Sequence, residues 1–285
     1  MHHLKIFIEL TRLNKPIGFM LLFWPCAWGL ALANSINKNP ILFYHYLILF
    51  FLGSILMRSA GCIFNDIVDK DYDKKVLRTK NRPIASGKIS VYQSLVYVII
   101  LCLVAFFILI QFNVLTIILG LSSMFLAFSY PFMKRITYWP QLFLGITFNW
   151  GIIMASAAMN NAVPTEIIIL YLSAIFWTLG YDTIYGAQDM SEDEIIGLKS
   201  TSIKFKKNMK LFLSITYFIT ISLVLFLLYD QLGLNTTTAF LSVFILSLIY
   251  QIINFRERKT KNYLQLFKFN NFSGLLLFLT IINTN

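Results

Sequence analysis

Acidic side chains gather in two short clusters of a chain that otherwise contains few of them. Of the 13 Asp and Glu residues, four lie in NDIVDKDYD and five lie in YDTIYGAQDMSEDE. Crowded carboxylates repel one another unless a cation neutralises them, and Mg²⁺ is a hard cation that binds through oxygen ligands. Because Mg²⁺ in proteins usually keeps waters and also binds substrate phosphate oxygens, the two clusters predict a metal and diphosphate site.

The first cluster places three of its four aspartates on one side of a helix. Asp69 and Asp73 follow Asp66 at offsets of three and seven residues, so the three side chains fall close to one helical face. Asp71 departs from that face, and we expect it to be solvated.

The second cluster has a similar spacing over a longer segment. Asp189 and Asp193 follow Asp182 at offsets of seven and eleven residues, so all three would lie near one face if a single helix continued that far. Glu192 and Glu194 would flank that face. The opposing interpretation is that both clusters only solvate surface loops. The other loops of this chain are almost purely basic, which favours a specific site.

The composition indicates a membrane protein. Hydrophobic residues make up 58% of the 285 residues, and 27 residues are Phe. The mean hydropathy is +0.70, which excludes an ordinary soluble domain. A transmembrane helix needs about 20 apolar residues. We therefore predict an all-α fold, a polytopic bundle of about nine helices in a single domain over residues 1–285. The predicted spans are 17–36, 41–65, 90–110, 113–131, 139–159, 164–186, 211–229, 234–253 and 269–283.

The basic residues predict the orientation of the bundle. Of 24 Lys and Arg residues, 22 precede the first span or lie in alternate loops, whereas the opposite loops contain only Lys38 and Arg58 lies inside the second span. Short positively charged loops stay cytoplasmic, so the N-terminus and both acidic clusters are predicted to be cytoplasmic. The net charge of +11 then reflects topology and anionic lipid headgroups. We expect a lipid bilayer as a partner and no nucleic acid.

Basic residues follow each acidic cluster closely. Arg78 and Arg82 follow the first cluster, and Lys199 follows the second. The guanidinium of Arg suits phosphate oxygens because it can donate two parallel hydrogen bonds. The alternative is that these residues only set the membrane topology.

Two segments resemble the signatures of the UbiA-type membrane prenyltransferases. GCIFNDIVDKDYDKKVLRTKNRPIASG is similar to the pattern NDxxDxxxD followed by RTxxRPxxSG, and YDTIYGAQDMSEDEIIGLKST is similar to DxxxxxxDxxxD followed by GxKST. Three further stretches, LNKPIGFMLLFWPCAWGL, YPFMKR and YDTIYG, resemble members that prenylate 4-hydroxybenzoate. The resemblance covers nearly the whole chain. One small departure is Gly186, where the family usually has Ala, and we expect it to matter little.

The resemblance implies a nine-helix bundle with a central cavity, open laterally to lipid and capped by the two cytoplasmic motif loops. Its two motif halves would be about 1–131 and 132–285. The basic side chains of Arg78, Arg82 and Lys199 would neutralise diphosphate oxygens. The residues that bind Mg²⁺-diphosphate would be Asn65, Asp66, Asp69, Asp73, Asp182, Asp189 and Asp193, and the six aspartates among them would be the catalytic residues.

The implied reaction is Mg²⁺-dependent transfer of a polyprenyl group from polyprenyl diphosphate to 4-hydroxybenzoate, in ubiquinone biosynthesis at a bacterial inner membrane. The ring carbon ortho to the hydroxyl attacks an allylic carbocation, or a species close to one, while diphosphate leaves. Water must be excluded from that cation. The alternatives are another aromatic acceptor, or a cation-coupled transporter. Transporter sites usually lie near the bilayer midplane, whereas these acids lie at its boundary.

Three more residues are candidates for the aromatic substrate or the cation. Arg58 lies about 12 Å inside the second span, and an intramembrane arginine normally faces a cavity or a partner. It would bind the acceptor carboxylate, pair with a motif aspartate, or form a structural ion pair. Arg135 lies in YPFMKR at the entrance to the fifth span. Tyr185, one turn after Asp182, offers a π-face to a cation or simply packs between helices.

Overall fold

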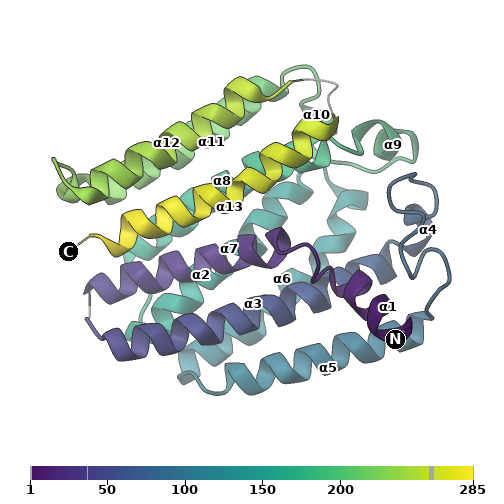
Figure 1. The fold of residues 1–285 in the computed structure, drawn as a ribbon, viewed down its shortest axis with the longest axis horizontal. Helices are drawn as coiled ribbons and strands as arrows, with labels where there is room; N and C mark the ends of the chain where they lie inside the picture. Colours follow the sequence, from purple (N-terminus) through teal and green to yellow (C-terminus); the bar gives the residue numbers. More distant parts are fainter. Residues whose placement is uncertain (1, 37, 257–259, 285) are drawn as a thin grey trace.

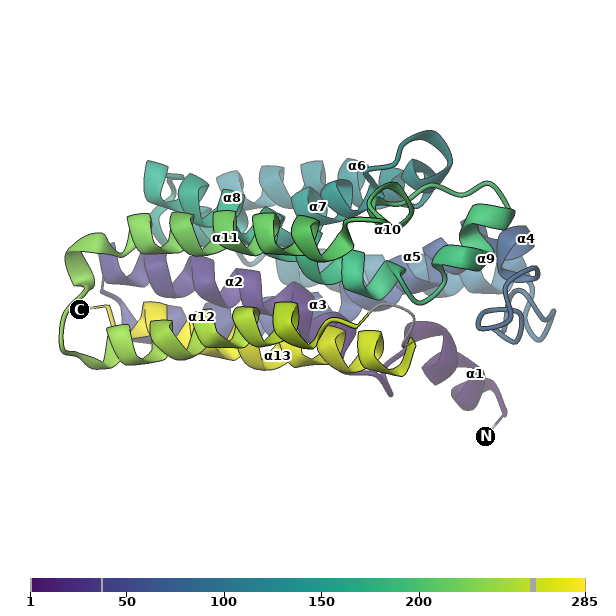
Figure 2. The ribbon, with the colours of Figure 1, turned by 90° about the horizontal axis from the view of Figure 1, so that it is seen from above.

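The structure, a computed structural model, describes residues 2–36, 38–256 and 260–284. Within these residues the fold is all-helical, and nine helices are long and apolar enough to cross a membrane. Figures 1 and 2 show them running along one common direction as a bundle, which confirms the predicted fold class. They are α2 (Ile17–Ile36), α3 (Pro40–Val68), α5 (Val91–Leu109), α6 (Val114–Ile136), α7 (Pro140–Asn160), α8 (Thr165–Gly186), α11 (Met209–Leu227), α12 (Thr236–Asn254) and α13 (Thr260–Ile282).

Most of the short helices lie at one end of the bundle. Figure 1 places them on the right, away from the C-terminus, and η1 (Tyr229–Gln231) follows α11 at the opposite end. The four at the motif end are α1 (His2–Thr11), α4 (Lys70–Asp73), α9 (Met190–Ile195) and α10 (Thr201–Lys204). Both acidic clusters therefore lie at the same end of the molecule.

Local sequence explains where several long helices begin. Ser90 and Gln93 form a reciprocal capping box at the start of α5, which satisfies backbone N–H groups that have no partner inside the helix. Asn113 caps α6 by accepting a hydrogen bond of 2.9 Å from the Thr116 N–H. Pro140 begins α7, a position where its missing N–H costs nothing.

The observed spans agree with the predicted ones to within three residues, except at the end of the fourth, where α6 continues to Ile136 rather than 131, and at the start of the ninth. The helix α13 begins at Thr260, nine residues before the predicted start. Its polar first half is accommodated because Asn270 is buried and donates a hydrogen bond of 2.8 Å to Gln251. Gln251 in turn accepts from Tyr217 at 2.9 Å. The division into two motif halves stays a prediction, and its limit at residue 131 lies inside α6.

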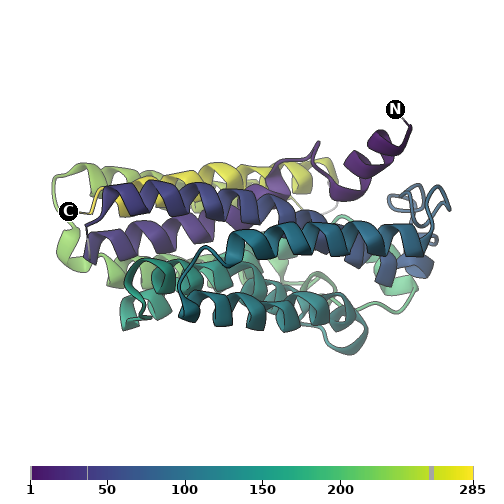
Figure 3. The same cartoon turned by 90° about the horizontal axis from the view of Figure 1, so that it is seen from below.

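The helices α2, α7 and α8 form the centre of the bundle. Trp28 and Trp177 are buried there with ring centroids 4.9 Å apart. A Cβ atom on Gly29 would lie 2.6 Å from the carbonyl oxygen of Ile152, so α2 and α7 approach this closely only because residue 29 is glycine. By contrast, α5 packs on α3 and α6 packs on α7, and α5 and α6 barely contact each other. Figure 3 shows this side of the bundle.

The helix α1 was not predicted from the sequence. It lies at the motif end (Figure 1), and its apolar residues Ile6 and Leu10 pack against Ile63 of α3 and Ile84 of the following loop. Arg12 follows it with a φ of 56°, a left-handed conformation that is uncommon for a residue other than glycine. The turn at Arg12 connects α1 to the start of α2, beside the first acidic motif.

Candidate active site

A cavity of about 1450 Å³ extends from the motif end into the bundle. Its walls come from α2, α3, α5, α6, α7 and α8, with a contribution from the first half of α13. Near the motifs the lining is acidic and basic, whereas Leu49, Phe50, Phe112 and Met154 line its deeper part. All seven oxygen-bearing side chains predicted to bind metal line this one cavity. A polar mouth therefore continues directly into an apolar chamber.

The first motif confirms the predicted helical face. The helix α3 ends at Val68, Asp69 closes it, and α4 adds one more turn. Asp66, Asp69 and Asp73 are all buried, whereas the side chain of Asp71 is 83% exposed and pairs with Lys74. The three buried carboxylates point to one side because the chain stays helical through this segment.

Arginines from two other segments neutralise Asp66 and Asp73. Arg12 lies 2.6 Å from the Oδ1 atom of Asp66, and Arg82 lies 3.0 Å from the same atom. Arg82 also reaches Oδ2 of Asp73 at 2.8 Å. Burial raises the pKa of Asp73, and the charge of Arg82 opposes that increase. These buried carboxylates therefore need positive charge nearby to stay ionised.

Of the three buried aspartates in the first motif, Asp69 has a carboxylate oxygen that lacks a hydrogen-bond partner among the described residues. Lys134 at the end of α6 forms an ion pair with its Oδ2 atom. Its Oδ1 atom is buried and accepts no hydrogen bond from the described residues, and Arg135 lies 3.5 Å away. A buried acceptor without a partner is costly, and an additional cation would satisfy it.

The second motif does not continue the helix as predicted. The helix α8 ends at Gly186, and Asp189 precedes the separate short helix α9. Turns through 187–189 break the regular spacing, because the Asp189 N–H bonds to Gly186 rather than to Tyr185. The expectation of one helical face for Asp182, Asp189 and Asp193 is therefore wrong. The turn nevertheless brings all three to the same cavity.

Arg78 connects the two motifs. Its Nε atom donates to both carboxylate oxygens of Asp189, at 2.7 and 3.0 Å. Its Nη1 atom donates to the hydroxyl of Tyr185 at 3.2 Å, and its guanidinium lies 5.6 Å from the centre of that ring. A residue of the first motif loop thus neutralises an aspartate of the second.

Asp193 and Glu194 have different surroundings although they are adjacent in the sequence. Burial, reinforced by the charge of Asp189, raises the pKa of Asp193 to about 6. Glu194 pairs with Lys206 at 2.6 Å and does not line the cavity. Glu194 thus lies beside the site and not in it, as expected for a residue that flanks the aspartates.

Lys199 lies between the second motif and the end of α6. Its Nζ atom donates to the carbonyl oxygen of Ile136 at 3.1 Å. Its backbone N–H donates to the carbonyl oxygen of Lys134 at 2.8 Å. The side chain also lines the cavity. These contacts hold Lys199 beside the carboxylates without pairing it to any of them.

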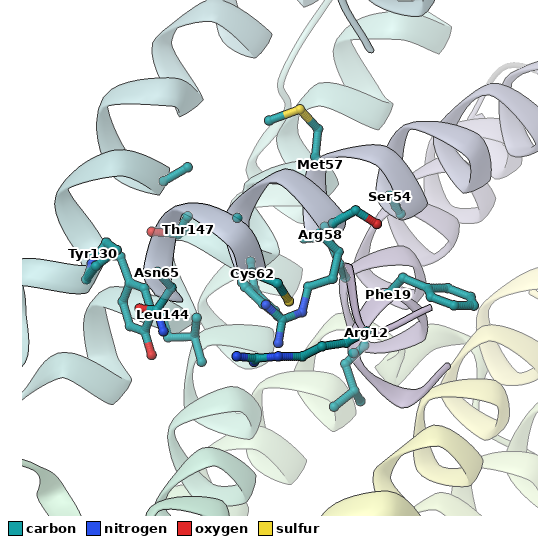
Figure 4. Close-up of a pocket in the computed structure, with 18 of the residues that line it drawn as sticks. Arg12, Phe19, Ser54, Met57, Arg58, Cys62, Asn65, Tyr130, Leu144 and Thr147 are labelled. Carbon is teal, nitrogen blue, oxygen red and sulfur yellow. The ribbon is translucent and has the colours of Figure 1, made fainter. Parts of the chain in front are cut away.

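Arg58 extends from α3 into the cavity. Its Nε atom is buried and has no hydrogen-bond partner among the described residues, and its guanidinium lies 5.5 Å from the ring centre of Phe148. Figure 4 shows Arg58 and Arg12 converging in this pocket, with Cys62 beside them. A Cβ atom on Gly18 would lie 3.0 Å from the Arg58 Nε. The site therefore offers an unused donor for an acidic ligand.

Arg135 occupies a different position from the one predicted for a substrate ligand. Its Nη2 atom donates to the carbonyl oxygen of Val68 at 2.7 Å, and its guanidinium stacks 4.9 Å from the ring centre of Tyr72. It does not line the cavity. Its contacts support the end of α3 and Asp69 rather than the chamber.

Sequence reasoning missed three functional contacts. Arg12 and Lys134 count among the basic residues that predict the topology, and Glu192 is predicted only to flank the second motif, although it accepts a hydrogen bond from the Leu77 N–H. Their only sequence signal was proximity to the acidic ends of the spans. Each contacts a residue more than 50 positions away, which spacing along the chain does not reveal.

The carboxylates fit a hard cation by their chemistry. Their donor atoms are all oxygens, and Asp69 Oδ1 accepts no hydrogen bond from any residue that the structure describes. In the part of the chain that the structure describes, no three His, Cys, Asp or Glu side chains converge on one point as a metal cluster. Arg12, Arg82, Lys134 and Arg78 instead neutralise them. A cation would therefore enter by replacing these basic side chains.

A family model described as the UbiA prenyltransferase family matches residues 22–274. The chain belongs to the UbiA prenyltransferase family. A 4-hydroxybenzoate octaprenyltransferase of Vibrio vulnificus (strain CMCP6) is 38% identical over 274 residues, which cover 96% of this chain and 95% of that relative. The mitochondrial 4-hydroxybenzoate polyprenyltransferase of Homo sapiens is 49% identical over 212 residues, which cover 74% of this chain and 57% of the relative. The chain spans about half the length of the mitochondrial relatives it matches.

Solved structures of the UbiA family share the fold. The apo structure of a UbiA homologue from Aeropyrum pernix K1 has a TM-score of 0.77 at 22% identity, covering 92% of this chain and 96% of that one. A UbiA homologue from Archaeoglobus fulgidus bound to DMAPP and Mg²⁺ has a TM-score of 0.71 at 17% identity, covering 98% and 99%. Both likenesses confirm the helical bundle of this multi-pass membrane protein.

Proposed function

We propose that this protein transfers a polyprenyl group from polyprenyl diphosphate to the ring carbon ortho to the hydroxyl of 4-hydroxybenzoate. The observation that carries the proposal is that both acidic motifs open into one cavity, which continues into an apolar chamber. The relatives of Vibrio vulnificus and Homo sapiens that act on 4-hydroxybenzoate support the choice of acceptor. The prenylated product would then serve ubiquinone biosynthesis.

The motif side chains would hold the diphosphate end of the donor. Mg²⁺, when bound, supplies positive charge that stabilises the departing diphosphate. Arg78, Arg82 and Lys199 would neutralise its remaining oxygens, and Arg78 and Arg82 would leave their present carboxylate partners to do so. The residues that would hold Mg²⁺ are Asn65, Asp66, Asp69, Asp73, Asp182, Asp189 and Asp193.

The reaction would break the bond between the prenyl carbon and the diphosphate oxygen, whose electron pair leaves with diphosphate. The ring carbon then forms the new carbon–carbon bond and loses its proton. The ring of Tyr185 lines the cavity beside Arg78 and would offer its π-face to the allylic cation. Apolar walls around the chamber exclude the water that would otherwise capture that cation.

Arg58 would bind the carboxylate of the aromatic acceptor. Arg58 lines the cavity with its guanidinium beside Arg12 and Cys62 (Figure 4), and its buried Nε atom has no hydrogen-bond partner among the described residues. Arg135 lies outside the cavity lining, so we assign it to positioning Asp69 rather than to contact with substrate. The acceptor ring would then lie between Arg58 and the diphosphate.

We further propose that the N-terminus and both motif loops face the cytoplasm of a bacterial inner membrane. The support is the distribution of basic residues, with 22 of 24 Lys and Arg on the predicted cytoplasmic side or before the first span. A single-cysteine variant at Lys75, in a background without Cys26, Cys62 and Cys102, should react with a membrane-impermeant maleimide only after the cells are opened. Labelling in intact cells would reverse the orientation.

Membranes containing the protein provide the direct test of activity. Labelled 4-hydroxybenzoate, a polyprenyl diphosphate and Mg²⁺ should give a lipid-extractable product, and EDTA should prevent its formation. Asp69→Ala should also prevent it, whereas the exposed Asp71→Ala should not. Failure to prenylate 4-hydroxybenzoate or any other aromatic acceptor would refute the enzyme assignment and reopen the transporter alternative.

A further inference from the structure

Glu192 joins the two motif loops although it belongs to neither set of aspartates. Its Oε2 atom accepts a hydrogen bond of 2.9 Å from the backbone N–H of Leu77. Leu77 lies in the loop after the first motif, and Glu192 lies in α9 of the second. The contact links segments 115 positions apart, so it fixes one loop relative to the other.

The position of Leu77 gives this contact its importance. Leu77 directly precedes Arg78, which bridges to Asp189 and Tyr185 across the same junction. The side chain of Arg78 is 40% exposed, so packing alone does not hold it. A long side chain loses conformational entropy when it is ordered. Anchoring the preceding backbone N–H reduces the freedom that Arg78 must lose.

We propose that Glu192 is a positioning residue that holds the Arg78 turn between the two motifs. It acts through the Leu77 N–H and makes no contact with the substrate. This inference rests on the proposed function, in which Arg78 neutralises diphosphate oxygens. With Leu77 anchored, Arg78 only rotates its side chain from Asp189 to the incoming diphosphate. Preorganisation of this kind increases affinity by lowering the ordering cost of binding.

Glu194 provides a matched control on the same short helix. It lies two residues after Glu192, carries the same carboxylate and pairs with Lys206 at 2.6 Å. That pair stays within the second motif loop and does not reach the first. A variant of Glu194 therefore changes the same charge without touching the link to Leu77.

Hydrogen–deuterium exchange of the full-length protein in nanodiscs tests the contact without any substrate. Glu192→Ala should increase the exchange rate of the Leu77 amide by about tenfold, since its acceptor is lost. Glu192→Gln keeps an acceptor oxygen and should remain near the wild type, and Glu194→Ala should leave this amide unchanged. Equal exchange in wild type and Glu192→Ala would overturn the proposal, whether or not the protein is a prenyltransferase.

Steady-state kinetics test the consequence for the site. Glu192→Ala should raise the KM for polyprenyl diphosphate by about three- to tenfold, the effect of one ordinary hydrogen bond lost at an exposed position. We expect kcat and the KM for the acceptor to stay within about twofold, and Glu192→Gln to restore most of the loss.

A role for Glu192 as a metal ligand predicts a different result. Glu192→Gln would then be as damaging as Glu192→Ala, and the half-saturating Mg²⁺ concentration would rise in both variants. That pattern would overturn the positioning role. A wild type with no activity would instead refute the proposed function, and the exchange rate of the Leu77 amide would still decide the contact.

Discussion

The Nη2 atom of Arg12 lies 2.6 Å from the Oδ1 atom of Asp66, although 54 positions separate the two residues. Arg12 stands at the turn between α1 and α2, and α1 is held there by its own apolar face. Asp66 is 2% exposed, and a buried carboxylate depends on such partners. The turn that follows the N-terminal helix therefore contributes a cation to the first motif.

Loss of Arg12 should weaken the site without unfolding the bundle. Arg12→Ala leaves Asp66 with Arg82 as its remaining ion-pair partner. We expect kcat/KM for polyprenyl diphosphate to fall about tenfold or more, since hydrogen bonds to charged groups contribute roughly 1.5–3 kcal/mol. Steady-state kinetics in membranes measure this. The control is Lys5→Ala on the exposed side of α1, and equal kinetics of the two variants would contradict the role of Arg12.

Substitution of Arg58 should affect the acceptor more than the donor. Arg58→Ala should raise the KM for 4-hydroxybenzoate by about tenfold or more, because it removes the donor for the carboxylate. The KM for polyprenyl diphosphate should change little. Initial rates at varied concentrations of each substrate separate the two effects. An increase confined to the KM for polyprenyl diphosphate would show that Arg58 binds the diphosphate and not the acceptor.

Gly18→Ala gives an independent test of the same subsite. Its Cβ atom would lie 3.0 Å from the Arg58 Nε, so the guanidinium has to shift. We expect a smaller rise in the acceptor KM than for Arg58→Ala. Gly233→Ala, whose Cβ would meet only Asn235 at 3.8 Å, should leave the acceptor KM unchanged. An unchanged acceptor KM in Gly18→Ala would show that a Cβ atom at residue 18 does not displace the Arg58 guanidinium.

Asp193 should make the stability of the metal-free protein depend on pH. Its pKa of about 6 in the fold exceeds the ordinary value of 3.8, so between these values the folded state holds a proton that the unfolded state releases. Stability without Mg²⁺ therefore rises as pH falls through about 6, and the charged carboxylate destabilises the fold above that pH. Mg²⁺ should stabilise the protein most at neutral pH and progressively less below pH 6, since protons compete with it.

Thermal unfolding in detergent across this pH range, with EDTA and with Mg²⁺, measures the effect. Asp193→Asn should flatten the dependence seen in EDTA. Asp230→Asn, at the opposite end of the bundle in η1, should retain it. A wild-type curve in EDTA that superimposes on that of Asp193→Asn would show that Asp193 does not titrate in this range.

Gly186→Ala should destabilise the fold, in contrast to what the sequence suggested. A Cβ atom at residue 186 would lie 2.7 Å from the hydroxyl oxygen of Ser202, which donates to the Thr183 carbonyl oxygen at 2.8 Å. Overpacking costs about 1–3 kcal/mol and the better helix propensity of Ala returns up to about 1 kcal/mol. A net loss of about 1 kcal/mol in thermal unfolding is expected. In a Ser202→Ala background, which lacks the obstructing hydroxyl but keeps the Cβ atom, Gly186→Ala should cause no such loss; a loss of the same size there would mean that the Ser202 hydroxyl is not the obstacle.

The parts of the site that follow local helical spacing could be predicted from the sequence. Asp66, Asp69 and Asp73 lie within two turns, so their common face and the solvation of Asp71 follow from helical geometry. Apolar run lengths placed the first eight spans for a similar reason. The predicted ninth span starts nine residues late because the first nine residues of α13 do not form an apolar run. Inside the span, Gln251 of another helix satisfies Asn270.

Contacts between distant segments could not be predicted in this way. The turn after Gly186 is stabilised by backbone hydrogen bonds of residues 187–189, which the spacing of acidic residues does not encode. Lys134 and Arg12 are basic residues near span ends, as many topology determinants are. Only the packing of α6 and α1 against α3 assigns them to Asp69 and Asp66.

Both motifs are expected to act on one diphosphate in one cavity. The Mg²⁺-dependent rate of product formation by Asp69→Asn, Asp189→Asn and their double variant measures this. Each single variant should reduce the rate about 100-fold or more, and the double variant should be little worse than either, because residues that act as one unit are not additive. Asp71→Asn should retain the wild-type rate. An Asp189→Asn variant with nearly wild-type activity would contradict the account, since the second motif would then play no part in the reaction.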